Sequence, residues 1–294
     1  MYRFIRAEKA FYKVRTLCRV LGVSASGYYA WCSRPPSVRS LHDAELARAI
    51  VRIHQASRCT YGRPRIHAEL RYEGKRCSGK RVARLMRAAG IAGIPARRRR
   101  RSLTRRAPGI APHPDLVERR FHSSEPDRLW VGDITYVPTG EGWLYLATLL
   151  DCCSRRIVGW SMATHLRSEL VVDALEMATS RRRPSSGLVH HSDQGSQYVS
   201  LAFTRRLEES GICGSMGGVG SAYDNAAAES LFATIKRELV NRHRFPTRGA
   251  ARAAVFEFIE VFYNRRRLHS SLGYMSPAEF EQKFFVDVEE ATVA

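Results

Sequence analysis

The sequence contains no long apolar run. No stretch approaches the roughly 18 consecutive apolar residues that mark a membrane-spanning helix, so we expect no membrane span. The opening residues, Met1 to Arg6, form too short an apolar stretch for a secretory signal peptide. No internal repeat is visible. These absences leave a cytoplasmic protein as the expectation.

Cysteines are few, and their spacing does not suit a metal. None of the seven forms a CxxC pair, and none is spaced with the ten histidines as a zinc site requires. We therefore expect reduced thiols in the cytosol. The seven are Cys18, Cys32, Cys59, Cys77, Cys152, Cys153 and Cys213.

Acidic residues are scarce. There are 28 of them against 48 lysines and arginines, which gives a formal net charge of +20. Such an excess favours a polyanionic partner, and hence nucleic acid. A basic enzyme, or a coding bias that favours arginine over lysine, would also produce it. With 44% hydrophobic residues over 294 positions, the chain has the composition of a globular protein of about two domains.

The N-terminal third predicts two helical modules. Residues 1–36 contain two short helices around Gly22, a helix-turn-helix-like pattern that suits a DNA reader or a purely structural helical hairpin. Residues 41–94 follow as a helical DNA-binding domain, with Leu46 and Ile50 at helical spacing. Its basic residues form either a DNA-facing surface or a solvated charged face. They are Lys75, Arg76, Lys80, Arg81, Arg84 and Arg87.

Residues 95–120 are expected to form an extended linker. The stretch holds five consecutive arginines and then three prolines, and like charges repel while proline blocks helix formation. When DNA is bound, the arginine run could lie along phosphates, although a nuclear-localisation signal has a similar composition. The five are Arg97, Arg98, Arg99, Arg100 and Arg101.

From residue 121 onward the pattern changes to strands. Three apolar runs with short links predict an antiparallel meander, and alternating helices and strands follow it. This order indicates an α/β fold, with a mixed sheet flanked by helices. We expect strands at 129–137, 142–150, 156–162, 188–193 and near Ile212, and helices at about 167–180, 200–210 and 221–240.

Three acids in this region stand where a carboxylate is out of place unless something binds it. Asp133 interrupts the first buried strand, Asp193 closes the fourth, and Glu229 lies on the flank of the following helix, whose start at Ser221 to Asp224 resembles a capping box. An unpaired charge in a core costs several kcal/mol, so such acids are usually paired or bind metal. Three acids converging on a divalent cation in so basic a chain suggest phosphodiester chemistry.

Plainer explanations exist for each residue. A chain with 28 acids contains many such triples. Asp193 could be a turn residue and Glu229 a solvated helix acid, while Asp151 also ends an apolar strand and competes with Asp133 as a ligand. His190 and His191 could be ligands, but a histidine on a strand is more often simply hydrogen-bonded.

Carboxylate ligands suit Mg²⁺ or Mn²⁺. In a site with two such ions, one activates the attacking oxygen and the other stabilises the leaving oxygen. The attacker can be water, which nicks DNA, or a DNA 3′-hydroxyl, which transfers a strand. Lys236 lies seven residues beyond Glu229 and nearly in line with it on a helix, so it could hold the DNA backbone beside the metals.

Residues 244–294 predict a helical extension packed on the core. Phe256, Ile259, Val261 and Phe262 supply apolar contacts, and a capping box at Ser276 starts a last short helix. Three arginines would then meet phosphates. They are Arg265, Arg266 and Arg267.

Whole segments carry a resemblance to a known family. They closely resemble the catalytic subunit of bacterial insertion-sequence transposases with a retroviral-integrase-like (DDE) core, encoded by the second of two overlapping frames. The resemblance covers nearly the whole chain. The segments are Leu129 to Tyr136, His190 to Tyr198, Asp224 to Ser230, Tyr263 to Leu272, Cys18 to Trp31, Tyr61 to Ile66 and Arg81 to Arg87.

The resemblance implies a ribonuclease-H-like core at residues 121–243, in which the first and fourth strands are adjacent. It carries catalytic, metal-binding roles onto Asp133, Asp193 and Glu229 and a DNA-contacting role onto Lys236. It assigns no role to Asp151, which is therefore expected to be a structural acid.

The same resemblance implies a Mg²⁺-dependent enzyme that cleaves DNA at element ends and joins the freed 3′-hydroxyl to another strand. Expected partners are double-stranded DNA, further copies of the chain on that DNA, and an upstream-frame partner or fusion that adds a leucine zipper, since no such heptad segment is present here. The expected location is the bacterial cytoplasm, at the nucleoid. Rival functions are a catalytically inactive DNA-binding regulator of the element and a ribonuclease that acts on RNA–DNA hybrids.

Overall fold

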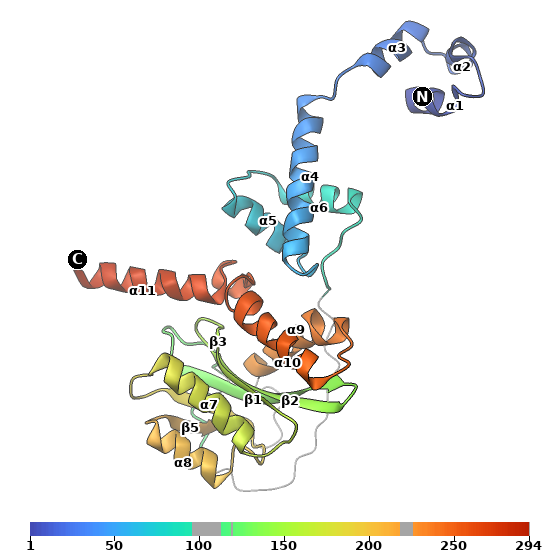
Figure 1. Ribbon diagram of the computed structural model, residues 1–294. Helices are drawn as coiled ribbons and strands as arrows, with labels where there is room; N and C mark the ends of the chain where they lie inside the picture. The colour runs from blue at the N-terminus through green and yellow to red at the C-terminus, as the bar shows by residue number, and fades with distance from the viewer. Residues whose placement is uncertain (96–112, 119, 218–225, 294) are drawn as a thin grey trace.

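The computed structural model describes residues 1–95, 113–118, 120–217 and 226–293 (Figure 1). Two expectations lie outside these residues: the arginine run Arg97 to Arg101 and the capping box at Ser221 to Asp224. Within the described residues, no helix is both long and apolar enough to cross a membrane.

The chain begins with a small three-helix unit. Helices α1 (Tyr2–Glu8), α2 (Val14–Val20) and α3 (Ala25–Ser33) enclose a core of Ile5, Cys18 and Tyr28. Gly22 makes the turn between α2 and α3 with a φ of +66°, which glycine adopts without a steric penalty. The two predicted helices around Gly22 are confirmed, and α1 completes their packing.

A second helical unit follows, made of α4 (Val38–Ala56), α5 (Arg63–Tyr72) and α6 (Gly79–Ala88). Ser78 caps α6, its hydroxyl accepting the amide of Arg81. The apolar faces of the three helices join the same buried cluster as the sheet domain. The unit is therefore packed against the rest of the chain rather than merely tethered to it.

The sheet domain has five strands in the order β3-β2-β1-β4-β5. The first three strands pair antiparallel, whereas β4 pairs parallel to β1 and β5 parallel to β4. This is the predicted mixed sheet of a ribonuclease-H-like fold, with the first and fourth strands adjacent. The strands are β1 (Leu129–Thr139), β2 (Gly142–Asp151), β3 (Ile157–Ala163), β4 (Val189–Ser192) and β5 (Cys213–Met216).

Helices cover both faces of this sheet (Figure 1). One face packs on α7 (Glu169–Arg182) and α8 (Leu201–Glu209), the other on α9 (Ala226–Glu238) and α10 (Arg248–Phe256). Side chains alternate along β1, so Trp130 joins the first cluster while its neighbour Val131 joins the second.

The tail beyond α10 differs in detail from expectation. The π-helical turn η2 (Glu257–Tyr263) follows α10 directly, and its wider winding changes which positions face inward. Ile259 and Phe262 are buried as expected, but Phe256 and Val261 are exposed, and Phe258 takes the buried place instead.

The 3₁₀ turn η3 (Ser270–Leu272) precedes the last helix, α11. The capping box is confirmed, because Glu279 Oε2 accepts both the amide and the hydroxyl of Ser276, at 2.8 Å each. The helix spans Pro277–Val293, 17 residues, so the expectation of a short last helix is wrong.

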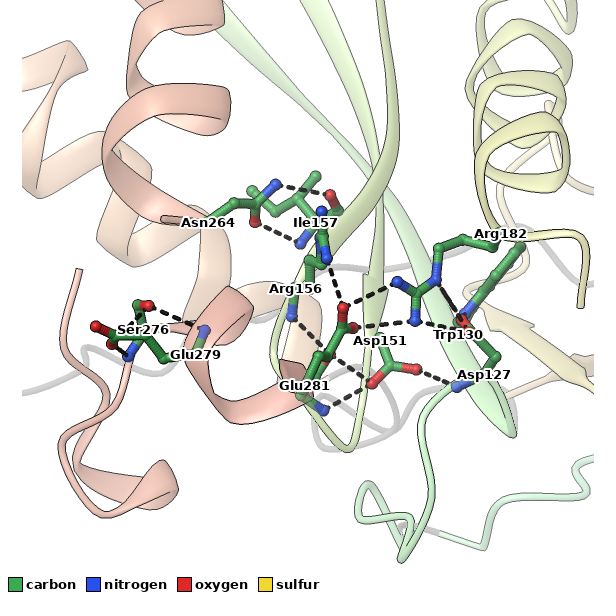
Figure 2. Close-up of polar contacts among 11 residues, drawn as sticks. Asp127, Trp130, Asp151, Arg156, Ile157, Arg182, Asn264, Ser276, Glu279 and Glu281 are labelled. Atoms are coloured by element: carbon green, nitrogen blue, oxygen red, sulfur yellow. Dashed lines mark hydrogen bonds and ion pairs between the residues drawn. The ribbon is translucent and has the colours of Figure 1, made fainter. Parts of the chain in front are cut away.

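A buried ionic network ties α11 to the sheet (Figure 2). Glu281 accepts hydrogen bonds from Arg156, just before β3, and from Arg182 at the end of α7. Arg182 also forms a forked pair with Asp127, at 2.6 and 2.9 Å to Oδ2. One carboxylate therefore holds three separate segments together.

Asp151 has a structural role beside this network. Its carboxylate accepts the amides of Asp127, Cys153 and Ser154 and the hydroxyl of Ser154. Burial raises the pKa of Asp151. Because its oxygens are engaged by the turn after β2, Asp151 acts as the expected structural acid.

Removing Glu281 is predicted to destabilise the fold. Glu281→Ala leaves two partly buried arginines without a shared carboxylate, which should lower the free energy of unfolding by about 3 kcal/mol. Urea unfolding measures the change. Glu289→Ala, on the exposed end of the same helix, should change it by less than about 0.5 kcal/mol. Equal stability of the two variants would contradict the network's role.

Candidate active site at the ends of β1 and β4

The register of β1 on β4 sets the position of two predicted acids. The parallel pairs are Leu129 with Val189, Trp130 with His190 and Val131 with His191. Asp133 is two residues beyond the last of these pairs on β1, and Asp193 directly follows the end of β4 at Ser192. Continued by two residues, the same register would bring Asp133 and Asp193 opposite each other and to one face of the sheet, with neighbouring strands about 4.8 Å apart.

The side chain of Tyr198 lies near both acids. Its side chain is buried, and burial raises the pKa of its phenol well above the ordinary value. The negative charges of Asp133 and Asp193 raise that pKa further. A single phenol is thus close enough to both carboxylates to be influenced by each.

Backbone amides orient both carboxylates. Asp193 Oδ1 accepts the amide of Gly195 at 2.9 Å, and Asp133 Oδ1 accepts the amide of Ile134 at 2.7 Å. Both side chains are partly buried. Asp133 lies within β1, and Asp193 directly follows the end of β4.

Gly132 allows the side chain of His190 to approach the backbone of β1 closely. A Cβ added there would lie 2.6 Å from His190 Nε2 and 3.3 Å from the ring of Tyr198. A glycine at this position therefore leaves space for the histidine ring beside the β1 backbone.

The two histidines of β4 have packing roles. Burial lowers the pKa of His190 to about 3, with a further contribution from His191 and His113, so the ring is neutral near pH 7. The ring packs edge-on against Phe203. His191 Nδ1 lies 2.9 Å from the hydroxyl of Ser215. These contacts match the simpler of the two expectations for strand-borne histidines.

Helix α9, which carries Glu229 in its first turn, packs on the sheet beside β1. Lys236 Nζ lies 4.9 Å from the ring centre of Tyr136. The chain beyond α9 also contacts β1, where Phe245 bridges to Thr139.

The described residues contain no preformed three-ligand metal site: no three His, Cys, Asp or Glu side chains lie close enough together to hold an ion. Glu229 is partly buried on α9.

The predicted DNA-contacting arginines divide into two groups. Arg265 and Arg266 are exposed. Arg267 is buried and forms a forked ion pair with Glu238, at 2.7 and 2.8 Å. Its guanidinium thus joins the tail to α9 instead of facing outward, which differs from the expected phosphate contact.

The basic surface of the second helical unit is also partly neutralised. Lys75 pairs with Glu45, and both Arg81 and Arg84 pair with Asp43. Arg76, Lys80 and Arg87 are exposed.

Sequence reasoning missed two features here. Tyr198 stands in the quoted run from His190 onward but received no role. The buried charge of Glu238 could have been noticed because it interrupts the apolar side of the α9 segment, between Ile235 and Leu239.

Three known domain families match parts of this chain. An integrase core domain matches residues 123–222, a second integrase core model matches 210–277, and an HTH-like domain matches 41–100. Transposase InsF for insertion sequence IS3A of Escherichia coli is 39% identical over 96% of this chain and 98% of its own length. The chain belongs to the IS3 family of insertion-sequence transposases.

Other relatives and solved structures extend the comparison. An uncharacterized 31 kDa protein of insertion element IS600 from Shigella sonnei is 40% identical over 91% of this chain and 98% of its own. The simian T-cell lymphotropic virus intasome chain has a TM-score of 0.46 at 12% identity, over 79% of this chain and 74% of its own. The HTLV-2 integrase catalytic core, solved with magnesium, has a TM-score of 0.41 at 18% identity, over 54% and 98%.

The space at Gly132 gives a direct test of the site's packing. Gly132→Ala forces a methyl group against the buried His190 ring, and such overpacking should lower the free energy of unfolding by about 1–3 kcal/mol. Thermal unfolding measures it. Gly79→Ala is the matched control, because a Cβ there meets nothing within 4 Å. If Gly132→Ala were as stable as Gly79→Ala, the close approach would be disproved.

Proposed function

We propose that this IS3-family chain is a DDE transposase. It cleaves DNA at the ends of an insertion sequence and transfers the freed 3′-hydroxyl to another strand. The observation that supports the proposal is the parallel register of β1 and β4, which, continued by two residues, would bring Asp133 beside Asp193. We propose that Glu229, on the helix α9 that packs on the sheet beside β1, completes the site.

The donor set suits magnesium or manganese. Three carboxylates supply only oxygen ligands, which hard divalent cations prefer. Two bound ions would supply activation of the attacking oxygen and stabilisation of the leaving oxygen. Asp133, Asp193 and Glu229 would hold them.

The reaction proceeds in two displacements at phosphorus. In the first, water attacks the phosphodiester at the element end, and the bond from phosphorus to the 3′-oxygen breaks and leaves a 3′-hydroxyl. In the second, that hydroxyl attacks a target phosphodiester and displaces its 3′-oxygen. The sheet holds Asp133 and Asp193 in fixed positions through their amide contacts, so the acids act from a preorganised site.

Other basic groups would bind the rest of the DNA. Lys236 lies beside the site, and Arg265 and Arg266 are exposed on the tail. We extend the proposal to the linker arginines, Arg97 to Arg101, as phosphate contacts. We also propose assembly of several copies on DNA, an upstream-frame partner or fusion, and a place at the bacterial nucleoid.

One observation favours a second candidate, a DNA-binding regulator without catalytic activity. Among described residues no three-acid group is close enough for a metal. A nicking assay with and without Mg²⁺ separates the two functions, because the regulator binds element ends but leaves them uncut.

Loss of either of two acids should abolish cleavage while binding remains. Asp133→Asn and Glu229→Gln each remove a ligand worth several kcal/mol in the transition state, so nicking and strand transfer should fall by about 10³-fold or more. Affinity for end DNA should be kept. Asp173→Asn, an exposed acid on α7, should leave both reactions unchanged. Full strand transfer by either site variant would refute the assignment.

Lys236→Ala should weaken DNA binding without changing sequence preference. Loss of one phosphate contact should reduce the slope of log affinity against log salt by about 0.9. Anisotropy titrations at several salt concentrations measure this slope. Arg205→Ala, at an exposed position on α8, is the control and should leave it unchanged.

A further inference from the structure

Two large aromatic side chains are exposed at the end of the β1–β2 hairpin. Tyr136 is 52% exposed and Trp143 is 48% exposed. Their ring centres are 4.9 Å apart at an interplanar angle of 76°. Tyr136 pairs directly with Tyr145, and Trp143 is two residues from Tyr145, so both rings lie on one face of the sheet. We call Tyr136 and Trp143 the aromatic platform.

Positive charge borders the aromatic platform. Lys236 Nζ lies 4.9 Å from the ring centre of Tyr136. Arg248 donates from Nε to the carbonyl of Trp143 at 3.3 Å, and its amide binds Glu141. A flat apolar surface bordered by cations is the combination that proteins use to bind unpaired nucleic acid, with bases on the rings and phosphates on the cations.

The aromatic platform is near the proposed catalytic acids along β1 but on the other face of the sheet. Tyr136 is three residues beyond Asp133, about 10 Å, and side chains alternate along a strand, so the two point to opposite faces. Among the described residues, β1 has no pair with β4 beyond Val131, and Lys236 of α9, which packs on the face of Asp133, reaches the ring of Tyr136. A DNA strand that passes this edge of β1 beside Lys236 can therefore have a phosphate at Asp133 and a base, several nucleotides away, on the platform.

We infer that the aromatic platform stacks an unpaired base of the DNA strand that passes the catalytic acids, several nucleotides from the bond to be cut, while Lys236 holds an adjacent phosphate. This inference rests on the proposed function. An unpaired base is required because the faces of bases within a duplex are covered by their neighbours. A second copy of the chain is a poorer occupant, since two surfaces bordered by cations repel each other.

Binding measurements on the full chain test this inference without any catalytic step. The probes are a DNA duplex with a short unpaired 3′ extension, the same duplex with abasic nucleotides in the extension, and a blunt duplex. Anisotropy is measured without divalent metal. The wild-type chain should bind the base-bearing extension about tenfold more tightly than the abasic one, the effect of losing one stacked base.

Platform variants should lose this preference selectively. Trp143→Ala and Tyr136→Ala should bind the base-bearing and abasic probes equally, whereas Trp143→Phe and Tyr136→Phe should keep most of the preference because a ring remains. Phe256→Ala is the matched control, since Phe256 is an aromatic side chain that is 50% exposed away from the platform, and it should keep the full preference.

Three outcomes would overturn the inference. The first is equal binding of both probes by the wild-type chain. The second is a loss in Phe256→Ala as large as in the platform variants. The third is a platform variant that keeps the preference but changes its oligomeric state in sedimentation, which would make the surface a contact between copies.

The proposed function is tested separately. Asp133→Asn should retain the base preference in full. If the wild-type protein prefers the base-bearing probe but never cuts DNA, the enzymatic proposal is wrong and the platform inference stands. If it cuts DNA but shows no base preference, the platform inference is wrong and the enzymatic proposal stands.

Discussion

Three residue pairs between β1 and β4 determine the geometry of the candidate site. They set a parallel register that, continued by two residues, would bring Asp133 and Asp193 to the same face of the sheet. A shift of one residue would turn one of the two side chains to the opposite face. Gly132 leaves room for the ring of His190, which packs against Phe203. The geometry of the candidate site therefore depends first on how these strands pair.

Helix α9 links this sheet to the rest of the molecule. Its last turns are fixed by the buried pair of Glu238 with Arg267, while the hydroxyl of Tyr61, from the second helical unit, accepts the next amide, that of Leu268, at 2.7 Å. The helical unit expected to bind DNA therefore rests on the same tail segment that anchors the helix bearing Glu229. A change in the packing of that unit against the tail would be transmitted to the end of α9 through these short polar contacts.

The sequence was informative where structure is decided locally. Alternating and continuous apolar runs located all five strands, and the Ser276 capping box located the start of α11, because both patterns depend on neighbouring residues. The family resemblance added the adjacency of β1 and β4. The burial of Arg267, the exposure of Phe256 and the docking of Tyr61 were not predictable in this way. Each depends on a distant partner or on the π-helical turn η2, which shifts the inward face without a clear signature in the sequence. The roles of Asp133, Asp193 and Glu229 stay a prediction, because their spatial relation depends on strand register and on the course of α9, which no local pattern encodes.

The course of α9 has a consequence for inheritance. Glu229 and Lys236 share one side of the helix only because two turns, almost a whole number, separate them. Loss or gain of a single residue between them would rotate one relative to the other by about 100°. Under the proposed function, this chain can therefore exchange many of the intervening side chains but has little freedom to alter the length of that stretch.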